Sequence, residues 1–140
     1  MDLTVYPGTG LPTANANHVK NPQQNKFLPA TMTDQPGMPG VGPDLVYRDP
    51  RGNPYVISFD LNYDNECRDA IYKLRSVSRS IPGKPGGYGG LINSQNNPDT
   101  DCFEYHGGVM VWSVGPDRDI DTNQPANLSP NRDNILSWQP

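Results

Sequence analysis

Gly108-Val109-Met110-Val111-Trp112-Ser113-Val114 runs directly into Gly115-Pro116-Asp117. The first seven residues form a near-continuous apolar run of strand length, which is typical of a strand buried on both faces. We therefore expect it to be the central strand of a small sheet, with a polar, turn-rich segment following Gly115. Just upstream, Cys102-Phe103-Glu104-Tyr105-His106 alternates apolar and polar residues and predicts a second strand. Together the two runs predict strands over about 102–114.

The composition limits how large a core this sheet can have. The 140 residues include 16 Pro and 14 Gly, and only 34% are hydrophobic, whereas Pro and Gly together make up about 12% of an average chain. These values exclude a helical bundle, a doubly wound α/β domain and a membrane-embedded protein. The net charge of −4 and the absence of a cationic stripe argue against nucleic-acid binding. We expect an α+β, β-rich fold with long irregular loops.

A hairpin is the strongest local pattern upstream of these strands. Two β-type runs, 44–48 and 55–60, flank Asp49-Pro50-Arg51-Gly52-Asn53-Pro54. Asp, Pro and Gly at the first, second and fourth positions of the link fit a type I turn. The sequence therefore predicts a hairpin over about 44–60. It also predicts a short helix over about 65–78, because Cys67, Ile71, Leu74 and Val77 share one helical face.

Two stretches have no periodicity. Residues 6–43 and 83–101 are rich in Pro, Gly and Asn, and we expect irregular structure there. The prediction is a single domain over 1–140, in which an irregular arm (1–43) packs on a head (44–140) that carries a cation-binding loop at 115–138. The Gly-rich run around Tyr88 lacks the residues of a phosphate-binding loop and is interpreted as a plain loop.

Cys67 and Cys102 are the only cysteines. A bridge between them would close a loop of about 35 residues and contribute about 3–4 kcal/mol in the loop-entropy model. Two buried free thiols are the alternative. The small expected core favours the bridge and an oxidising compartment.

Oxygen donors are concentrated near the C-terminus. A hard cation with about six to eight oxygen ligands would neutralise such a loop, and a solvated acidic loop is the alternative. An EF-hand is excluded, because Thr122 and Leu128 stand where its Gly and bidentate Glu belong. The side chains concerned are Asp117, Asp119, Asp121, Asn123, Asn131, Asp133 and Asn134.

Catalytic residues are few. Glu104 and His106 lie on one face of the predicted strand and would be paired as orienter and base. A surface His near a Glu is the simpler interpretation, since no nucleophile lies in a recognisable elbow. We therefore expect no enzyme.

Three stretches carry a family resemblance. Residues 47–56 (Tyr-Arg-Asp-Pro-Arg-Gly-Asn-Pro-Tyr-Val) resemble the Asp-Pro-Trp-Gly-Asn-Pro-Tyr hairpin of type II secretion major pseudopilins, members of the type IV pilin-like family. Residues 112–117 (Trp-Ser-Val-Gly-Pro-Asp) are similar to their strand ending in Ser-Leu-Gly-Ala-Asp. Residues 133–138 (Asp-Asn-Ile-Leu-Ser-Trp) are similar to their closing Asp-Ala-Asp-Ile-x-x-Trp. The resemblance spans roughly residues 44–138.

The resemblance implies calcium as the cofactor. Carried over by position, it places ligands at Asp117, at the backbone carbonyl of Val114 and at Asn134. The family's remaining Asp falls on Arg132, which cannot bind a cation, so neighbouring Asp133 is the expected substitute. Reserve ligands are Asp119, Asp121 and Asn131. Arg51 also departs from the family, standing where it has Trp.

The resemblance further implies a non-catalytic structural subunit. We expect the head of a pseudopilus or related filament subunit in the periplasm or cell envelope, its parent anchored by an N-terminal helix that this chain lacks. Its expected partners are other pilin or pseudopilin subunits and secreted cargo, with neither nucleic acid nor membrane bound by this fragment. The alternative is a secreted, calcium-dependent module that binds glycan or protein through Tyr88, Tyr105 and Trp138.

Overall fold

The computed structural model describes residues 2–6, 9–26, 28–79, 86–95 and 101–139. Contacts divide the chain into two compact units, Met1–Pro54 and Tyr55–Pro140. The boundary falls inside the segment predicted as one hairpin. Within the described ranges, no helix has the length and apolar character needed to cross a membrane.

The first unit contains a short 3-10 turn, η1 (Ala16–His18), and a two-stranded antiparallel sheet of β1 (Gly40–Val41) and β2 (Tyr47–Arg48). The predicted turn forms after β2. Asp49 is buried, and its Oδ1 accepts hydrogen bonds from the backbone N–H groups of Arg51 (2.8 Å) and Asn53 (2.9 Å).

The predicted hairpin over 44–60 is wrong beyond this turn. Arg48 forms a single bridge with Pro54, the last residue of the link, and among the described residues no ladder joins the two β-type runs. Pro54 has no N–H to extend a ladder, and β2 pairs instead with β1. The downstream run forms β3 (Val56–Phe59), which pairs with a strand of the second unit.

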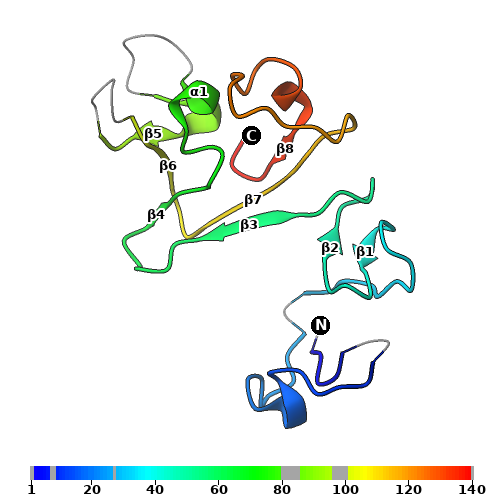
Figure 1. Cartoon of the computed structure of the whole chain (residues 1–140). Helices are drawn as coiled ribbons and strands as arrows, with labels where there is room; N and C mark the ends of the chain where they lie inside the picture. Colours follow the sequence, from blue (N-terminus) through cyan, green and yellow to red (C-terminus); the bar gives the residue numbers. More distant parts are fainter. Residues whose placement is uncertain (1, 7–8, 27, 80–85, 96–100, 140) are drawn as a thin grey trace. The chain divides into compact units, whose positions relative to one another are not determined.

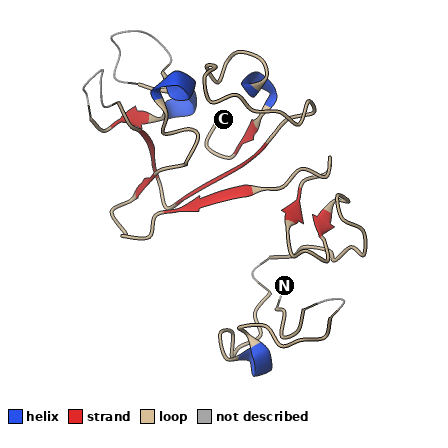
Figure 2. Ribbon diagram, viewed as in Figure 1, coloured by secondary structure: helices blue, strands red, loops and turns tan. Residues whose placement is uncertain are grey.

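The second unit is built on two small antiparallel sheets (Figures 1 and 2). One has the order β3-β7-β8, with β7 at Val109–Ser113 and β8 at Ile135–Leu136. The other has the order β4-β6-β5, with β4 at Glu66–Cys67, β5 at Ile92–Asn93 and β6 at Phe103–His106. The β-rich class and the strands over 102–114 are therefore confirmed, and β7 is the central strand of its sheet as expected.

The core of the second unit is aromatic. Met110 and Trp112 face inward from β7, and the Tyr72 ring packs edge-on against both tryptophans, with centroids 5.3 Å from Trp112 and 5.1 Å from Trp138. Edge-to-face pairs of this kind contribute about 0.5–1.5 kcal/mol beyond their buried area. The buried cluster consists of Cys67, Tyr72, Val77, Leu91, Phe103, Met110, Trp112 and Trp138.

The helix predicted over 65–78 is largely wrong. Its first residues form β4, and helix α1 covers only Arg75–Ser78. Between them, Asp69 Oδ1 accepts hydrogen bonds from the N–H groups of Ile71 (2.9 Å) and Tyr72 (3.0 Å). Such side-chain bonds compete with helical ones. Of the apolar residues that suggested a helical face, Cys67 is buried from β4 and Val77 from α1, whereas Ile71 and Leu74 are half-buried in the segment between them.

Asp69 also joins this turn to the β3-β7-β8 sheet. Its Oδ2 accepts hydrogen bonds from Ser58 Oγ on β3 (2.8 Å) and from Trp112 Nε1 on β7 (3.1 Å). The residue is 1% exposed, so water cannot replace these bonds. One side chain thus holds β3, β7 and the segment leading into α1 together.

We predict that Asp69→Ala lowers the free energy of unfolding by about 3 kcal/mol or more, because it leaves several buried donors without an acceptor. The exposed Asp34 is the control, and Asp34→Ala should stay within about 0.5 kcal/mol of wild type. Urea unfolding followed by tryptophan fluorescence measures both. Equal stabilities for the two variants would contradict the role given to Asp69.

Candidate metal centre in the C-terminal loop

The segment after β7 leaves the sheet and returns to it as β8, and its two ends are joined by hydrogen bonds. The Gly115 N–H donates to Asn134 Oδ1 (3.2 Å), and the Asp117 N–H makes a long bond to Asp133 Oδ2 (3.5 Å). The structure therefore brings the backbone of 115–117 together with the side chains of Asp133 and Asn134, which lie just before β8 in the sequence. Val114, whose carbonyl was predicted as a ligand, is half-buried immediately before Gly115.

Asp133 has one carboxylate oxygen without a partner. Its Oδ1 is buried and accepts no hydrogen bond from any residue that the structure describes. The carboxylate lies against Gly115, where a Cβ atom would collide with both the Asp133 side chain and its backbone oxygen. A buried, unpaired carboxylate oxygen is energetically costly, and a bound cation would remove that cost. The donors here are all oxygen, so they fit a hard cation.

Asn134 connects this loop to the aromatic core. Its Oδ1 accepts the Gly115 N–H, and its Nδ2 donates to the Tyr72 hydroxyl (3.0 Å). Burial raises the pKa of Tyr72 to about 12, an effect to which the nearby Asp69 adds and which the Asn134 hydrogen bond opposes. The loop and the ring that packs on both tryptophans are therefore directly linked.

Of the three reserve ligands, Asn131 already has a structural role. It is 2% exposed, its Oδ1 accepts the Asp121 N–H (2.9 Å), and its Nδ2 donates to the carbonyls of Asp121 and Gln124 (2.7 Å each). These bonds use the side chain to fold the loop.

The remaining acidic residues of the loop stabilise local turns. Asp117 Oδ1 accepts the Asp119 N–H (3.1 Å), and Asp121 Oδ1 accepts the Asn123 N–H (2.8 Å). Asp119 Oδ1 accepts the N–H of the next residue, Ile120 (2.8 Å). In each of the three carboxylates, the Oδ2 atom accepts no hydrogen bond from the residues that the structure describes.

The two cysteines are free thiols in this structure, so the bridge favoured from composition is not formed. Cys67 is buried in β4, and its partner in the ladder is Tyr105, which lies three positions after Cys102 in the sequence. The Cys67 Sγ donates a hydrogen bond to the Ser58 carbonyl (3.2 Å). Burial raises the pKa of the Cys67 thiol, which disfavours the reactive thiolate.

A second group of ligating side chains lies on β4 and β6. Glu104 and His106, considered as a pair from the sequence, are joined by Glu66, and one ligand atom from each lies within 4.8 Å of the others. Glu104 is buried and pairs with Arg68 rather than His106 (Arg68 Nε to Glu104 Oε2, 2.7 Å). Sequence reasoning missed Glu66 and Arg68 because it placed both in a helix.

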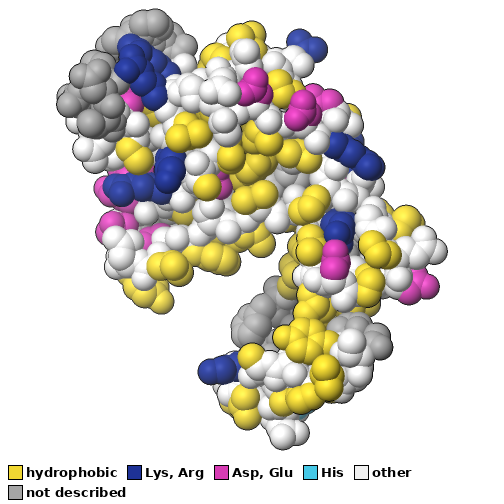
Figure 3. All heavy atoms as spheres, in the orientation of Figure 1, with side chains coloured by type: hydrophobic (Ala, Val, Ile, Leu, Met, Phe, Trp, Pro, Cys, Tyr) yellow, Lys and Arg dark blue, Asp and Glu magenta, His cyan; other side chains and the backbone are white. Residues whose placement is uncertain are grey.

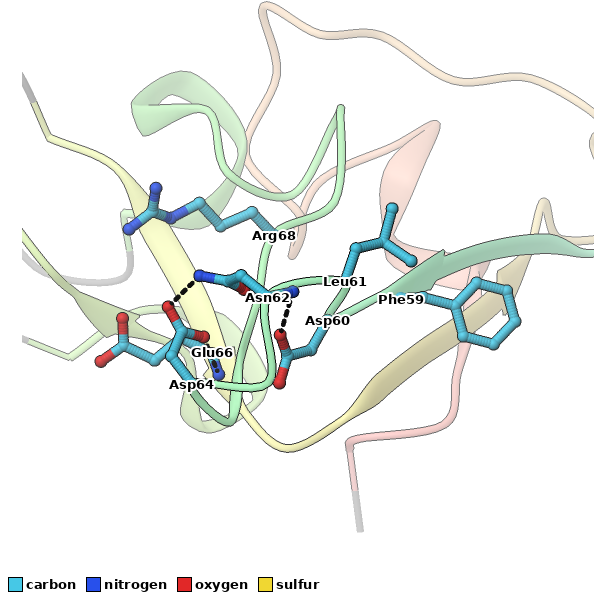
Figure 4. A pocket seen from close by; sticks show the side chains of 7 residues that line it. All are labelled: Phe59, Asp60, Leu61, Asn62, Asp64, Glu66 and Arg68. Carbon is cyan, nitrogen blue, oxygen red and sulfur yellow. Dashed lines mark hydrogen bonds between the residues drawn. The ribbon is translucent and has the colours of Figure 1, made fainter.

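Glu66 and Arg68 also line an open cavity of about 370 Å³ at the β3–β4 turn (Figure 4). Asp60 and Asp64 shape it: Asp60 accepts hydrogen bonds from the N–H groups of Asn62, Tyr63 and Asn65, and Asp64 accepts one from Asn62 Nδ2. Its other lining residues include the exposed side chains of Phe59 and Leu61.

No protein-family model, no curated protein and no solved structure matches this chain.

We predict that Tyr72→Phe makes the free energy of unfolding less dependent on pH above about pH 10. The folded-state pKa of Tyr72 is raised to about 12, against about 10 in an unfolded chain. The folded state therefore binds the proton more tightly, and wild type should lose up to about 2 kcal/mol of stability as the pH rises from about 10 to 12.

Urea unfolding at pH 9, 10 and 11.5 measures this effect. The difference in stability between wild type and Tyr72→Phe should shrink as the pH rises, because the variant has no hydroxyl to ionise there. A difference that stays constant over this range would contradict the raised pKa.

Proposed function

We propose that this chain is a non-catalytic structural subunit whose C-terminal loop is closed by a calcium ion, and that it forms the head of a type II secretion pseudopilin or a related pilin-like filament subunit. The observation that carries the proposal is the buried Asp133 oxygen without a hydrogen-bond partner, next to the N–H groups that join the two ends of the loop. The resemblance in residues 112–117 and 133–138 falls on the same two segments.

The donors at this loop suit calcium. Asp117 and Asp133 would supply carboxylate oxygens, and Asn134 and the Val114 carbonyl would supply neutral ones, with Asp119 and Asp121 in reserve. The bound ion would supply positive charge to a loop that carries four aspartates, which otherwise repel one another. The chain's own contribution is to hold β8 beside β7, through Asn134 and Gly115, so that the donors stay close together.

The β3-β7-β8 sheet supports a role in assembly. The outward side chains on β3 and β7 are apolar: Phe59 is 61% and Ile57 46% accessible, Val109 opposite Phe59 is exposed, and Val111 opposite Ile57 is half-buried. Figure 3 shows hydrophobic side chains along this part of the second unit. An exposed apolar patch of this kind is typical of a surface that contacts another polypeptide, and we propose other filament subunits of the cell envelope.

The glycan-binding alternative receives less support. Trp138, one of its three proposed contact residues, is 6% exposed and packs on Tyr72. Tyr88 and Tyr105 are half-buried. The proposed aromatic platform therefore lacks a tryptophan face at the surface.

Calcium should raise the melting temperature of the wild-type chain by several degrees relative to EGTA, since an ion at a thousandfold its Kd stabilises the folded state by about 4 kcal/mol. Asp133→Asn should melt at the same temperature in calcium and in EGTA, because it removes the buried charge. Asp117→Ala should also lose the response. Calorimetry in both buffers measures the difference, in which each variant's own stability cancels.

The matched control is Asp64→Asn, an acidic residue in the β3–β4 turn, which should keep the wild-type response to calcium. Identical wild-type melting curves in calcium and EGTA would remove the ion from the proposal. A calcium-dependent rise in melting temperature that persists in Asp133→Asn would mean that the ion binds at another site.

The assembly part of the proposal is tested by Phe59→Ser. Because Phe59 is exposed, the variant should stay within about 0.5 kcal/mol of wild-type stability yet form fewer cross-links to membrane-anchored, pilin-like subunits. Whole-cell cross-linking of the source organism, with partners identified by mass spectrometry, measures this. Unchanged cross-links in a folded Phe59→Ser variant would contradict assembly through this face.

A further inference from the structure

The β4–β6 ladder places three metal-ligating side chains on one face. Glu66 is opposite His106 in the antiparallel register, and Cys67 is opposite Tyr105. Side chains alternate along a strand, so Glu66 and His106 face away from the buried Cys67. Glu104 is two residues before His106 and therefore lies on the same face. One ligand atom from each of the three residues lies within 4.8 Å of the other two.

Glu104 is the fixed member of this group. It is only 2% exposed, and its carboxylate is charge-paired with Arg68, whose Nε donates to Oε2 at 2.7 Å. Within the described part of the chain, this is the one hydrogen bond that the carboxylate accepts, so Oε1 keeps its acceptor capacity. The Glu66 side chain is half-buried and His106 is exposed, so both can rotate toward a ligand held at Glu104.

We propose that Glu66, Glu104 and His106 bind a divalent transition-metal ion of the zinc type. An imidazole nitrogen with two carboxylate oxygens is a donor set that zinc accepts, at distances of about 2.0–2.2 Å. Calcium takes oxygen ligands, so the imidazole separates this site from the one proposed in the C-terminal loop. The three residues leave a fourth position for water. Arg68 balances part of the charge of the two carboxylates and orients Glu104.

The proposed zinc site is independent of the proposed structural role, because it shares no residue with the C-terminal loop. The two sites therefore have separate tests. Asp133→Asn should lose the calcium response and bind zinc with the wild-type Kd, whereas His106→Gln should bind zinc more weakly and keep the calcium response.

Isothermal titration of the full chain with zinc chloride, in calcium-free buffer, tests the proposal. Wild type should bind one zinc ion per chain. His106→Gln and Glu66→Gln should each weaken the Kd by at least about tenfold, since each removes one of three protein ligands. Both positions lie outside the core, so the variants should fold, and circular dichroism checks this.

Two control variants account for other zinc-binding groups. His18 is the only other histidine and pairs with Asp2 in the first unit (2.6 Å), so His18→Gln should bind zinc as wild type does. Cys102→Ser should also bind as wild type does. Cobalt in place of zinc should give visible d–d bands without the intense thiolate charge-transfer band.

Zinc binding with the wild-type Kd in His106→Gln, or binding that is lost in His18→Gln or Cys102→Ser, would overturn the assignment to these three residues. Titration without a saturable one-to-one step would overturn the site itself.

Discussion

The buried carboxylate of Asp69 accepts hydrogen bonds from strands β3 and β7 of one sheet and from the backbone that leads into α1. A chain with so few apolar residues cannot rely on a large core, so a side chain that connects several segments has unusual weight. The bond to Trp112 fixes the indole against which Tyr72 packs. Tyr72 in turn accepts a hydrogen bond from Asn134. The position of the C-terminal loop thus depends, through three contacts, on Asp69.

The two proposed metal sites differ in how the fold makes them. The C-terminal site forms where a loop of about twenty residues closes on itself, with Gly115 and Asn134 at its neck, and its donors are oxygen atoms of one acidic segment. The Glu66–Glu104–His106 site forms across a strand ladder, from residues nearly forty positions apart. Loop donors adapt to a large ion that accepts many oxygens, whereas strand pairing presents a small, fixed set.

Sequence reasoning succeeded where a local pattern was sufficient. The apolar run of β7 and the turn at Asp49 were expected from such patterns, whereas the meeting of residues 115–117 with Asp133 and Asn134 was implied by the family resemblance. It failed where partners decide the structure. The run before Asp49 pairs with β1 instead of β3, because Pro54 interrupts the ladder. The 65–78 segment has helical spacing, yet Asp69 takes the backbone N–H groups that a helix would use.

By itself, the sequence determined the class of fold, the central strand and the acidic segment that could hold a cation. Composition and hydrophobic periodicity can be read from the order of residues without knowing which segments meet in space. Only the tertiary structure decided which strands pair, that Asn131 is buried and hydrogen-bonded within the loop, and that Glu66 lies beside Glu104 and His106. Those outcomes depend on register between distant strands and on the satisfaction of buried polar groups, which no short window of sequence contains.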